Sequence, residues 1–211
     1  MLSWETQNTY YSDSVKTICG CDEAGRGPLA GPVFAAAVIL PKGHTIEELN
    51  DSKKMTSKTR EVLYDRIRRE ATAYAIAHAE VYEIEAINIL NASMLAMRRA
   101  IEQLDIEPEL ALIDGSIARD FTIPVEPVVK GDGKIPCIAA ASVLAKVARD
   151  RFCLEMERFY PGYNFAKNKG YATKEHKAAL LKYGPCPVHR RSFLRKTLGD
   201  DFEQHDIWQS W

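Results

Sequence analysis

The sequence has few cysteines, no long hydrophobic run and almost no net charge, and each shortage excludes a class of protein. Its five cysteines are odd in number and include no Cys-x-x-Cys pair, which argues against a disulfide framework and against a thiolate zinc site. The longest apolar run, residues 33–40, has the length of a strand and not of a bilayer span. The first residues lack the basic-then-apolar layout of a secretion signal. We therefore expect a cytoplasmic protein with reduced thiols.

The net charge of −1 excludes a broad positive field that would attract nucleic acid to the whole surface. A nucleic-acid partner would have to bind to local clusters of basic residues. With 211 residues, the chain is long enough to bury the core of one domain without disulfide or metal cross-links.

Apolar strand-like runs alternate with helix-like segments, which indicates an α/β protein with a central mixed sheet. The first two strands are joined by a turn rich in glycine and proline, which predicts a hairpin. Thr56 or Ser57 is suited to cap the first helix. The predicted strands are residues 15–21, 32–40, 72–80, 110–114 and 123–129, and the predicted helices are residues 58–70, 94–104, 138–159 and 174–183.

Four acids follow the ends of the predicted strands. Asp22 and Glu23 follow the first strand, Asp114 ends another, and Asp132 lies just beyond a third. Each acid taken alone is more typical of a turn residue. In an α/β sheet, however, the carboxyl ends of neighbouring strands meet at one edge, where ligands commonly bind. Carboxylates gathered there repel one another unless a cation lies between them.

An all-carboxylate cluster favours a hard divalent cation such as Mg²⁺ or Mn²⁺. Such ions commonly keep open positions for water and for phosphate oxygens. Two of them about 4 Å apart can orient an attacking water and stabilise the leaving oxygen of a phosphodiester. The acids therefore point to phosphodiester hydrolysis with two divalent ions.

Two glycine-rich segments suggest a rival class, a nucleotide-dependent oxidoreductase or phosphotransferase. In the first, Gly25-x-Gly27-x-x-x-Gly31, the spacing is one residue too long for a dinucleotide-binding loop. In the second, Gly131-x-Gly133-Lys134, the residues around the glycines do not fit a phosphate-binding loop. A non-catalytic nucleic-acid-binding module is a further alternative, which central acids disfavour unless metal ions neutralise them.

Taken in order along the chain, several short motifs resemble those of the bacterial type 2 ribonucleases H, the ribonuclease HII family. They extend over roughly residues 17–195 and comprise Asp22-Glu-Ala-Gly-Arg-Gly-Pro, Asn50-Asp-Ser-Lys-Lys-Met, Asn88-Ile-Leu-Asn-Ala-Ser-Met, Leu112-Ile-Asp-Gly, Val129-Lys-Gly-Asp, Ile138-Ala-Ala-Ala-Ser-Val-Leu-Ala-Lys-Val-Ala-Arg-Asp, Lys169-Gly-Tyr-Ala-Thr and His189-Arg-Arg-Ser-Phe.

The resemblance implies a ribonuclease H-like fold over residues 13–199, with a helical C-terminal part from about residue 160 and terminal extensions at 1–12 and 200–211. It also implies a monomeric endonuclease that acts in DNA replication and repair. This enzyme would cut the RNA strand of RNA–DNA hybrids and cut 5′ of single ribonucleotides embedded in duplex DNA. The products would carry a 3′-hydroxyl and a 5′-phosphate.

By the motifs of that family, Asp22, Glu23, Asp114 and Asp132 would be the catalytic and metal-binding acids. Asp150 is a tempting alternative to Asp132, but it lies on the long predicted helix and is assigned to structure.

The same resemblance places the segment Gly25-Arg26-Gly27 against the ribonucleotide and Tyr171 against the sugar that follows it. Close approach of backbone to the 2′-hydroxyl needs small residues. Alternatively, the glycines serve a hairpin turn, and Tyr171 packs a C-terminal helix.

Basic residues near these motifs, Lys53 among them, predict a positive groove for backbone phosphates. On the helix of residues 138–159, Ser142, Lys146, Arg149 and Cys153 form one stripe. We expect Ser142 and Lys146 to contact phosphate, although polar stripes are usually solvated. The other basic residues of the predicted phosphate groove are Lys54, Lys58, Arg60, Lys130, Lys134, Lys167, Lys169, Lys174, Arg190 and Arg191.

The C-terminal tail, Gln204-His-Asp-Ile-Trp208, loosely resembles the short peptides that dock onto a sliding clamp. An alternative is that Trp208 and Trp211 pack against the body of the protein.

Overall fold

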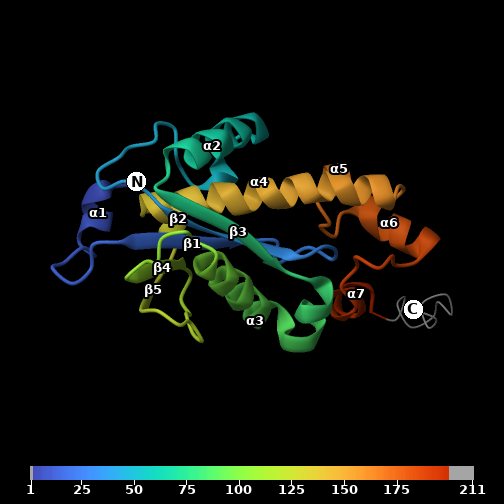
Figure 1. The fold of residues 1–211 in the computed structure, drawn as a ribbon. Coiled ribbons are helices and arrows are strands. Elements are labelled where there is room, and N and C mark those ends of the chain that lie inside the picture. Colours follow the sequence, from blue (N-terminus) through green and yellow to red (C-terminus); the bar gives the residue numbers. More distant parts are fainter. Residues whose placement is uncertain (1, 200–211) are drawn as a thin grey trace.

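Residues 2–199 are described in a computed structural model of the chain, and a mixed sheet lies at its centre (Figure 1). In the described residues the sheet has five strands in the order β3-β2-β1-β4-β5. The pairs β1–β2 and β2–β3 are antiparallel, whereas β1–β4 and β4–β5 are parallel. The predicted strands and the hairpin are therefore confirmed. The bounds are β1 (Ile18–Ala24), β2 (Val33–Ile39), β3 (Ala73–Ala79), β4 (Leu110–Asp114) and β5 (Val125–Val128).

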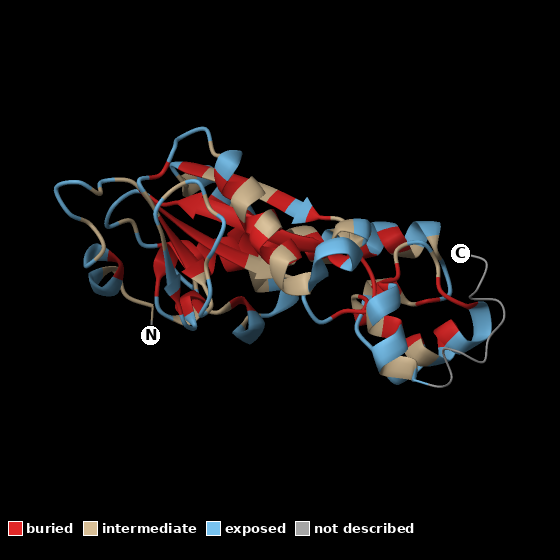
Figure 2. Cartoon of the chain, turned by 90° about the horizontal axis from the view of Figure 1, so that it is seen from below, coloured by how far each residue is buried: buried red, intermediate tan, exposed pale blue. Residues whose placement is uncertain are grey.

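Helices cover both faces of the sheet. One face packs against α4 (Pro136–Phe159), with α2 (Ser57–Glu70) beside it, and the other packs against α3 (Val81–Glu102). Beyond α4, a group of short helices extends past the end of the sheet and encloses a small core of its own (Figure 2). This is the predicted helical C-terminal part. It consists of α5 (Phe165–Asn168), α6 (Lys174–Tyr183) and α7 (Arg191–Leu198).

The composition of β1 and β2 explains how closely the helices approach them. Every residue of β2 is buried, and three of its seven residues are alanines, so both faces of this strand can be covered closely. Gly20 of β1 lies against the start of α4. A Cβ atom on Gly20 would lie 2.3 Å from the carbonyl carbon of Cys137, so only glycine fits there without moving the helix.

Several boundaries differ from the sequence predictions. β1 continues to Ala24, so Asp22 and Glu23 lie inside the strand and not after it. α3 begins at Val81, whereas the periodicity predicts a helix only from Met94. The cause is Asn88, whose φ of 66° and ψ of 165° interrupt the helix. Its side chain accepts hydrogen bonds from the amides of Leu90 and Asn91 and so starts the second part.

Four short elements were not predicted: α1 (Trp4–Asn8), η1 (Ser52–Lys54), α5 and α7. The loop expected at residues 130–134 contains a single 3-10 turn, η2 (Gly131–Gly133). The five cysteines are free thiols, as expected. Among residues 2–199, we find no helix with the length and apolar character that crossing a membrane requires.

Candidate active site

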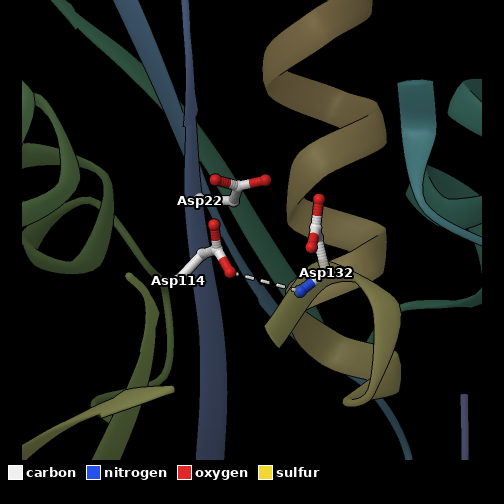
Figure 3. A group of neighbouring side chains, drawn as sticks. All are labelled: Asp22, Asp114 and Asp132. Atoms are coloured by element: carbon white, nitrogen blue, oxygen red, sulfur yellow. Dashed lines mark hydrogen bonds between the residues drawn. The ribbon is translucent and has the colours of Figure 1, made fainter. Parts of the chain in front are cut away.

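Three of the four predicted acids meet at one edge of the sheet. Cys21 of β1 is paired with Ile113 of the parallel strand β4, so Asp22 and Asp114 follow as neighbours. Asp132 reaches the same place from η2, after Lys130 has turned the chain with a φ of 55°. Side-chain oxygens of these three aspartates lie within 4.8 Å of one another (Figure 3). The sheet topology thus brings together acids that are far apart in the sequence.

Backbone hydrogen bonds fix the geometry of this cluster. The amides of Gly131 and Asp132 donate to Oδ1 of Asp114, at 2.6 Å and 3.3 Å. A Cβ atom on Gly131 would lie 2.6 Å from Cδ1 of Ile138, so a larger residue there would require the end of that side chain to move. Asp114 therefore has two functions, because it both joins the cluster and holds the loop that carries Asp132.

The cluster is electrostatically unfavourable without a cation. The pKa of Asp22 is raised well above its ordinary value, first by burial and then by the charges of Glu23 and Asp114. The pKa of Asp114 is also raised, by burial and by Asp132. Nζ of Lys53 is 3.3 Å from Asp132, but this lysine is largely exposed. Buried oxygen donors of like charge are what Mg²⁺ and Mn²⁺ bind, so the residues fit a divalent ion.

Glu23, the fourth predicted acid, points differently. Successive residues of a strand face opposite sides, so Glu23 leaves β1 in another direction from Asp22. Its Oε1 accepts a hydrogen bond of 3.2 Å from Arg26. Burial raises the pKa of Glu23, while the charge of Arg26 acts in the opposite sense. Glu23 lies outside the group of three aspartates and lines the pocket beside it.

A pocket of about 240 Å³ adjoins the carboxylates. The turn Gly25-Arg26-Gly27 forms one wall, and Tyr171, from the loop between α5 and α6, forms a second wall beside Gly27, with 46% of its surface exposed. Seven of the residues that the sequence predicts to bind substrate line this pocket. They are Gly25, Arg26, Gly27, Lys53, Ser142, Lys146 and Tyr171.

The polar stripe of α4 proves to be mostly buried. The hydroxyl of Ser142 is 2.8 Å from that of Ser52, and Nζ of Lys146 is 2.7 Å from Asp150. Arg149 is only 2% exposed, and Cys153 lies in the core of the C-terminal helices. Phosphate contact by Ser142 and Lys146 stays a prediction. Asp150 pairs with Lys146 and Arg60, away from the three aspartates.

Arg190 was predicted to belong to the phosphate groove, and this is wrong. Its side chain is completely buried and donates hydrogen bonds to the carbonyl oxygens of Gly25, Arg26 and Gly31, at 2.6 Å to 3.1 Å. Arg190 therefore holds the glycine turn that forms one wall of the pocket. No local pattern in the sequence separates this buried arginine from its exposed neighbour Arg191, because the partners lie more than 150 residues away.

A second hollow, of about 530 Å³, is lined in part by Asp132. Four lysines line it: Lys53, Lys54, Lys130 and Lys134. The two hollows share Lys53, so basic side chains continue past the carboxylates. The proposed clamp-binding segment, Gln204 to Trp208, lies outside the described residues.

Comparison with known proteins gives independent evidence of the family and the fold. The family model described as Ribonuclease HII matches residues 19–196. Ribonuclease HII of Caldicellulosiruptor saccharolyticus is 49% identical over 195 residues, which are 92% of this chain and 95% of the relative.

Two solved structures have the same fold. Ribonuclease H2 from Pyrococcus horikoshii OT3 has a TM-score of 0.71 at 23% identity, with 90% of this chain and all of that chain covered. Bst-RNase HIII in complex with Mn²⁺ also has a TM-score of 0.71, at 17% identity, with 90% of this chain and 71% of that chain covered. The fold is thus that of a ribonuclease H, and the chain belongs to the ribonuclease HII family as a ribonuclease H enzyme.

Proposed function

We propose that this protein is a metal-dependent endoribonuclease that cuts the RNA strand of RNA–DNA hybrids and cuts 5′ of single ribonucleotides in duplex DNA. The products carry a 3′-hydroxyl and a 5′-phosphate. One observation carries the proposal: Asp22, Asp114 and Asp132 converge within 4.8 Å beside a pocket that is walled by Gly25-Arg26-Gly27.

The three aspartates would hold Mg²⁺ or Mn²⁺, with Glu23 beside them. When bound, such ions supply an activated water and stabilise the negative charge that develops on the leaving oxygen. The Mn²⁺ named with the ribonuclease HIII structure supports a divalent ion, although that structure is only a fold relative. Around the ions, the protein excludes bulk water on the side of α4, because Asp22 and Ser142 are buried there.

The pocket supplies recognition of the ribonucleotide. The carbonyls of Gly25 and Arg26 are turned inward to Arg190, and Gly27, which has no side chain, lets a sugar approach the backbone of the turn. A 2′-hydroxyl both donates and accepts, so polar backbone groups can distinguish it from hydrogen. Beside Gly27, the exposed ring of Tyr171 stacks on the next sugar, where a 2′-hydroxyl would fit poorly.

Basic side chains hold the strand. Lys53 and Lys146 flank the pocket, and Lys54, Lys130 and Lys134 continue the positive surface beyond Asp132. Phosphates bound along this line would place a phosphodiester over the carboxylates.

The test is a cleavage assay with duplexes that carry one, four or many ribonucleotides, each incubated with Mg²⁺, with Mn²⁺ and with chelator. We expect cutting only with metal, and mapped ends of the stated polarity. A folded preparation that leaves all three duplexes intact with both ions would contradict the proposal. Binding without cutting would instead favour the alternative of a non-catalytic nucleic-acid-binding module.

We further propose that residues 13–199 form the catalytic domain and that the enzyme works as a monomer in the cytoplasm, in ribonucleotide and RNA-primer removal. The match of the family to residues 19–196 supports the extent of that domain. Contact between the tail and a sliding clamp stays a prediction, which a pull-down with and without residues 204–211 would test.

A further inference from the structure

One short segment, residues 186–190, contacts both walls of the substrate pocket. The amide of Gly31 donates to the carbonyl of Val188, and the amide of Arg190 donates to the carbonyl of Leu29, each at 2.8 Å. These bonds fasten the segment along the chain that follows Gly27. The side chain of Arg190 then binds the carbonyls of the glycine turn itself. Arg190 thus holds the first wall, the glycine turn, through the carbonyls of its backbone.

The same segment reaches the second wall through a pair of histidines. Nε2 of His189 lies 3.0 Å from Nε2 of His176, in the first turn of α6. Nδ1 of His176 lies 2.9 Å from the carbonyl oxygen of Tyr171. The carbonyl of Tyr171 also accepts a hydrogen bond from the amide of Thr173, two residues along the chain. The contact with His176 links Tyr171 to α6. We call the chain of contacts from Cys186 to Tyr171 the histidine relay.

The geometry fixes where the protons of the relay lie. The backbone amide of Cys186 donates to Nδ1 of His189 at 2.9 Å, so that nitrogen carries no proton. The carbonyl of Cys186, 3.2 Å from the same nitrogen, is therefore not its hydrogen-bond acceptor. A neutral His189 must then carry its proton on Nε2 and donate to Nε2 of His176. His176 in turn carries its proton on Nδ1 and donates to the carbonyl of Tyr171.

The relay is shielded from water. His176 is completely buried and His189 is 4% exposed. The rings of Tyr163 and Phe165 pack against both histidines, with centroid distances of 4.9 Å to 6.4 Å. Buried hydrogen bonds without competing water hold their partners in place more firmly than exposed ones.

We propose that His176, His189 and Arg190 are positioning residues that set the distance between the glycine turn and the ring of Tyr171. That distance determines which nucleotide the pocket accepts after the ribonucleotide: a deoxyribonucleotide or a second ribonucleotide. The inference rests on the proposed function, because it concerns substrate choice at the same pocket. The positioning residues touch no reacting atom and act through the two walls.

A matched pair of substitutions at one position tests the last contact of the relay, from His176 to the carbonyl of Tyr171. In His176→Asn, the side-chain amide can replace Nδ1 and still donate to Tyr171. In His176→Gln, the longer amide can replace Nε2 and meet His189, but the bond to Tyr171 is lost. We expect the preference for a single embedded ribonucleotide over a long hybrid to fall about tenfold in His176→Gln and about twofold or less in His176→Asn. His78→Asn, at an exposed histidine, is the control and should change nothing.

The change should appear in KM and kcat for the single-ribonucleotide duplex, with kcat on the long hybrid retained. Folded Asn and Gln variants with the same preference as the wild type would overturn the proposal. So would an equal loss in both variants, because a purely structural histidine predicts that result.

A second measurement does not depend on activity. Nitrogen-15 NMR of the imidazoles reports which nitrogen carries the proton, and the chain has only five histidines to assign. We expect His189 protonated on Nε2 and His176 protonated on Nδ1 at neutral pH. Any other pair of tautomers overturns the relay. If the wild type cut no duplex while these tautomers were found, the proposed function would fail and the relay would stand.

Discussion

Asp22 occupies a position where its own negative charge is unfavourable. Its side chain is 4% exposed, and burial together with two neighbouring carboxylates raises its pKa. When folding raises the pKa of a carboxyl group, the folded protein loses stability as the pH rises above the pKa of that group in the unfolded chain. At neutral pH the charge of Asp22 therefore opposes folding. Such a cost is typical of a site organised for a cation and not for stability.

Replacing Asp22 by asparagine should therefore separate stability from activity. We expect Asp22→Asn to lower cleavage by at least about a hundredfold, because one oxygen ligand is lost. In the metal-free protein at pH 7, the free energy of unfolding should rise by about 1 kcal/mol. Cleavage assays and urea denaturation measure the two effects. Near-normal turnover by this variant would reject Asp22 as a ligand.

Single residues also show what the sequence alone could reveal. Asp22, Asp114 and Asp132 were predictable because each lies near or just beyond the end of a recognisable strand, and the ends of neighbouring strands share an edge. Arg190 was not predictable in its actual role. Its sequence neighbours suggest an exposed basic pair, whereas its partners are carbonyls of a distant turn.

At the scale of elements, the strands were easier to predict than the helices. β4 has the predicted bounds because a short buried run is closed by an acid at one end. The first part of α3 was missed because Asn88 breaks the helical period between two helical parts. The close approach of α4 to β1 depends on a glycine in mid-strand, and a glycine there gives no sign of what lies against it.

Gly20→Ala should push α4 away from β1. The new methyl would lie 2.3 Å from backbone atoms of Cys137 and Ile138, which cannot rotate aside. Since α4 carries Ser142 and Lys146, we expect a loss of stability of about 2 to 3 kcal/mol, together with weaker substrate binding. Thermal or urea denaturation measures the first effect.

The matched control is Gly133→Ala, whose added Cβ has no heavy atom within 4 Å and whose φ is not positive. This variant should be close to wild type in stability. If Gly20→Ala were equally well tolerated, the tight contact between β1 and α4 would be refuted.

At the scale of the whole molecule, basic side chains gather beside the carboxylates although the protein carries almost no net charge. The net charge is −1, yet lysines line both hollows beside the carboxylates. Release of counterions from phosphates makes such binding depend on salt. For about four phosphate contacts, affinity for hybrid should fall about a hundredfold between 50 and 200 mM salt. Fluorescence anisotropy with the metal-free protein measures this, and an affinity independent of salt would refute the groove.

Acid should weaken the fold through the buried histidines. Burial, and then the neighbouring His176, lowers the pKa of His189 from 6.5 to about 3, and burial also lowers the pKa of His176. A group with a depressed pKa stabilises the fold above its unfolded pKa, and this stabilisation is lost as the pH falls towards the folded pKa. From pH 6.5 downwards, each histidine should lower the free energy of unfolding by up to about 1.4 kcal/mol per pH unit.

Asp22 and Asp114 oppose this trend, because their pKa values are raised. The informative measurement is therefore the difference between the wild type and His189→Gln in urea denaturation at several pH values. The variant should lack part of the slope below pH 6.5. Parallel curves for the two proteins would show that His189 is not buried in its neutral form.

The link between Arg190 and Gly25 has a consequence for how the enzyme is made. The two residues are 165 positions apart, and the turn leaves the ribosome long before the arginine that holds it. The sheet strands are all translated by residue 128, so a nascent chain can build its core while the pocket beside the carboxylates is still incomplete. Ribosome-bound chains that stop short of residue 190 should thus be folded but unable to select a ribonucleotide, which would delay activity until synthesis is nearly finished.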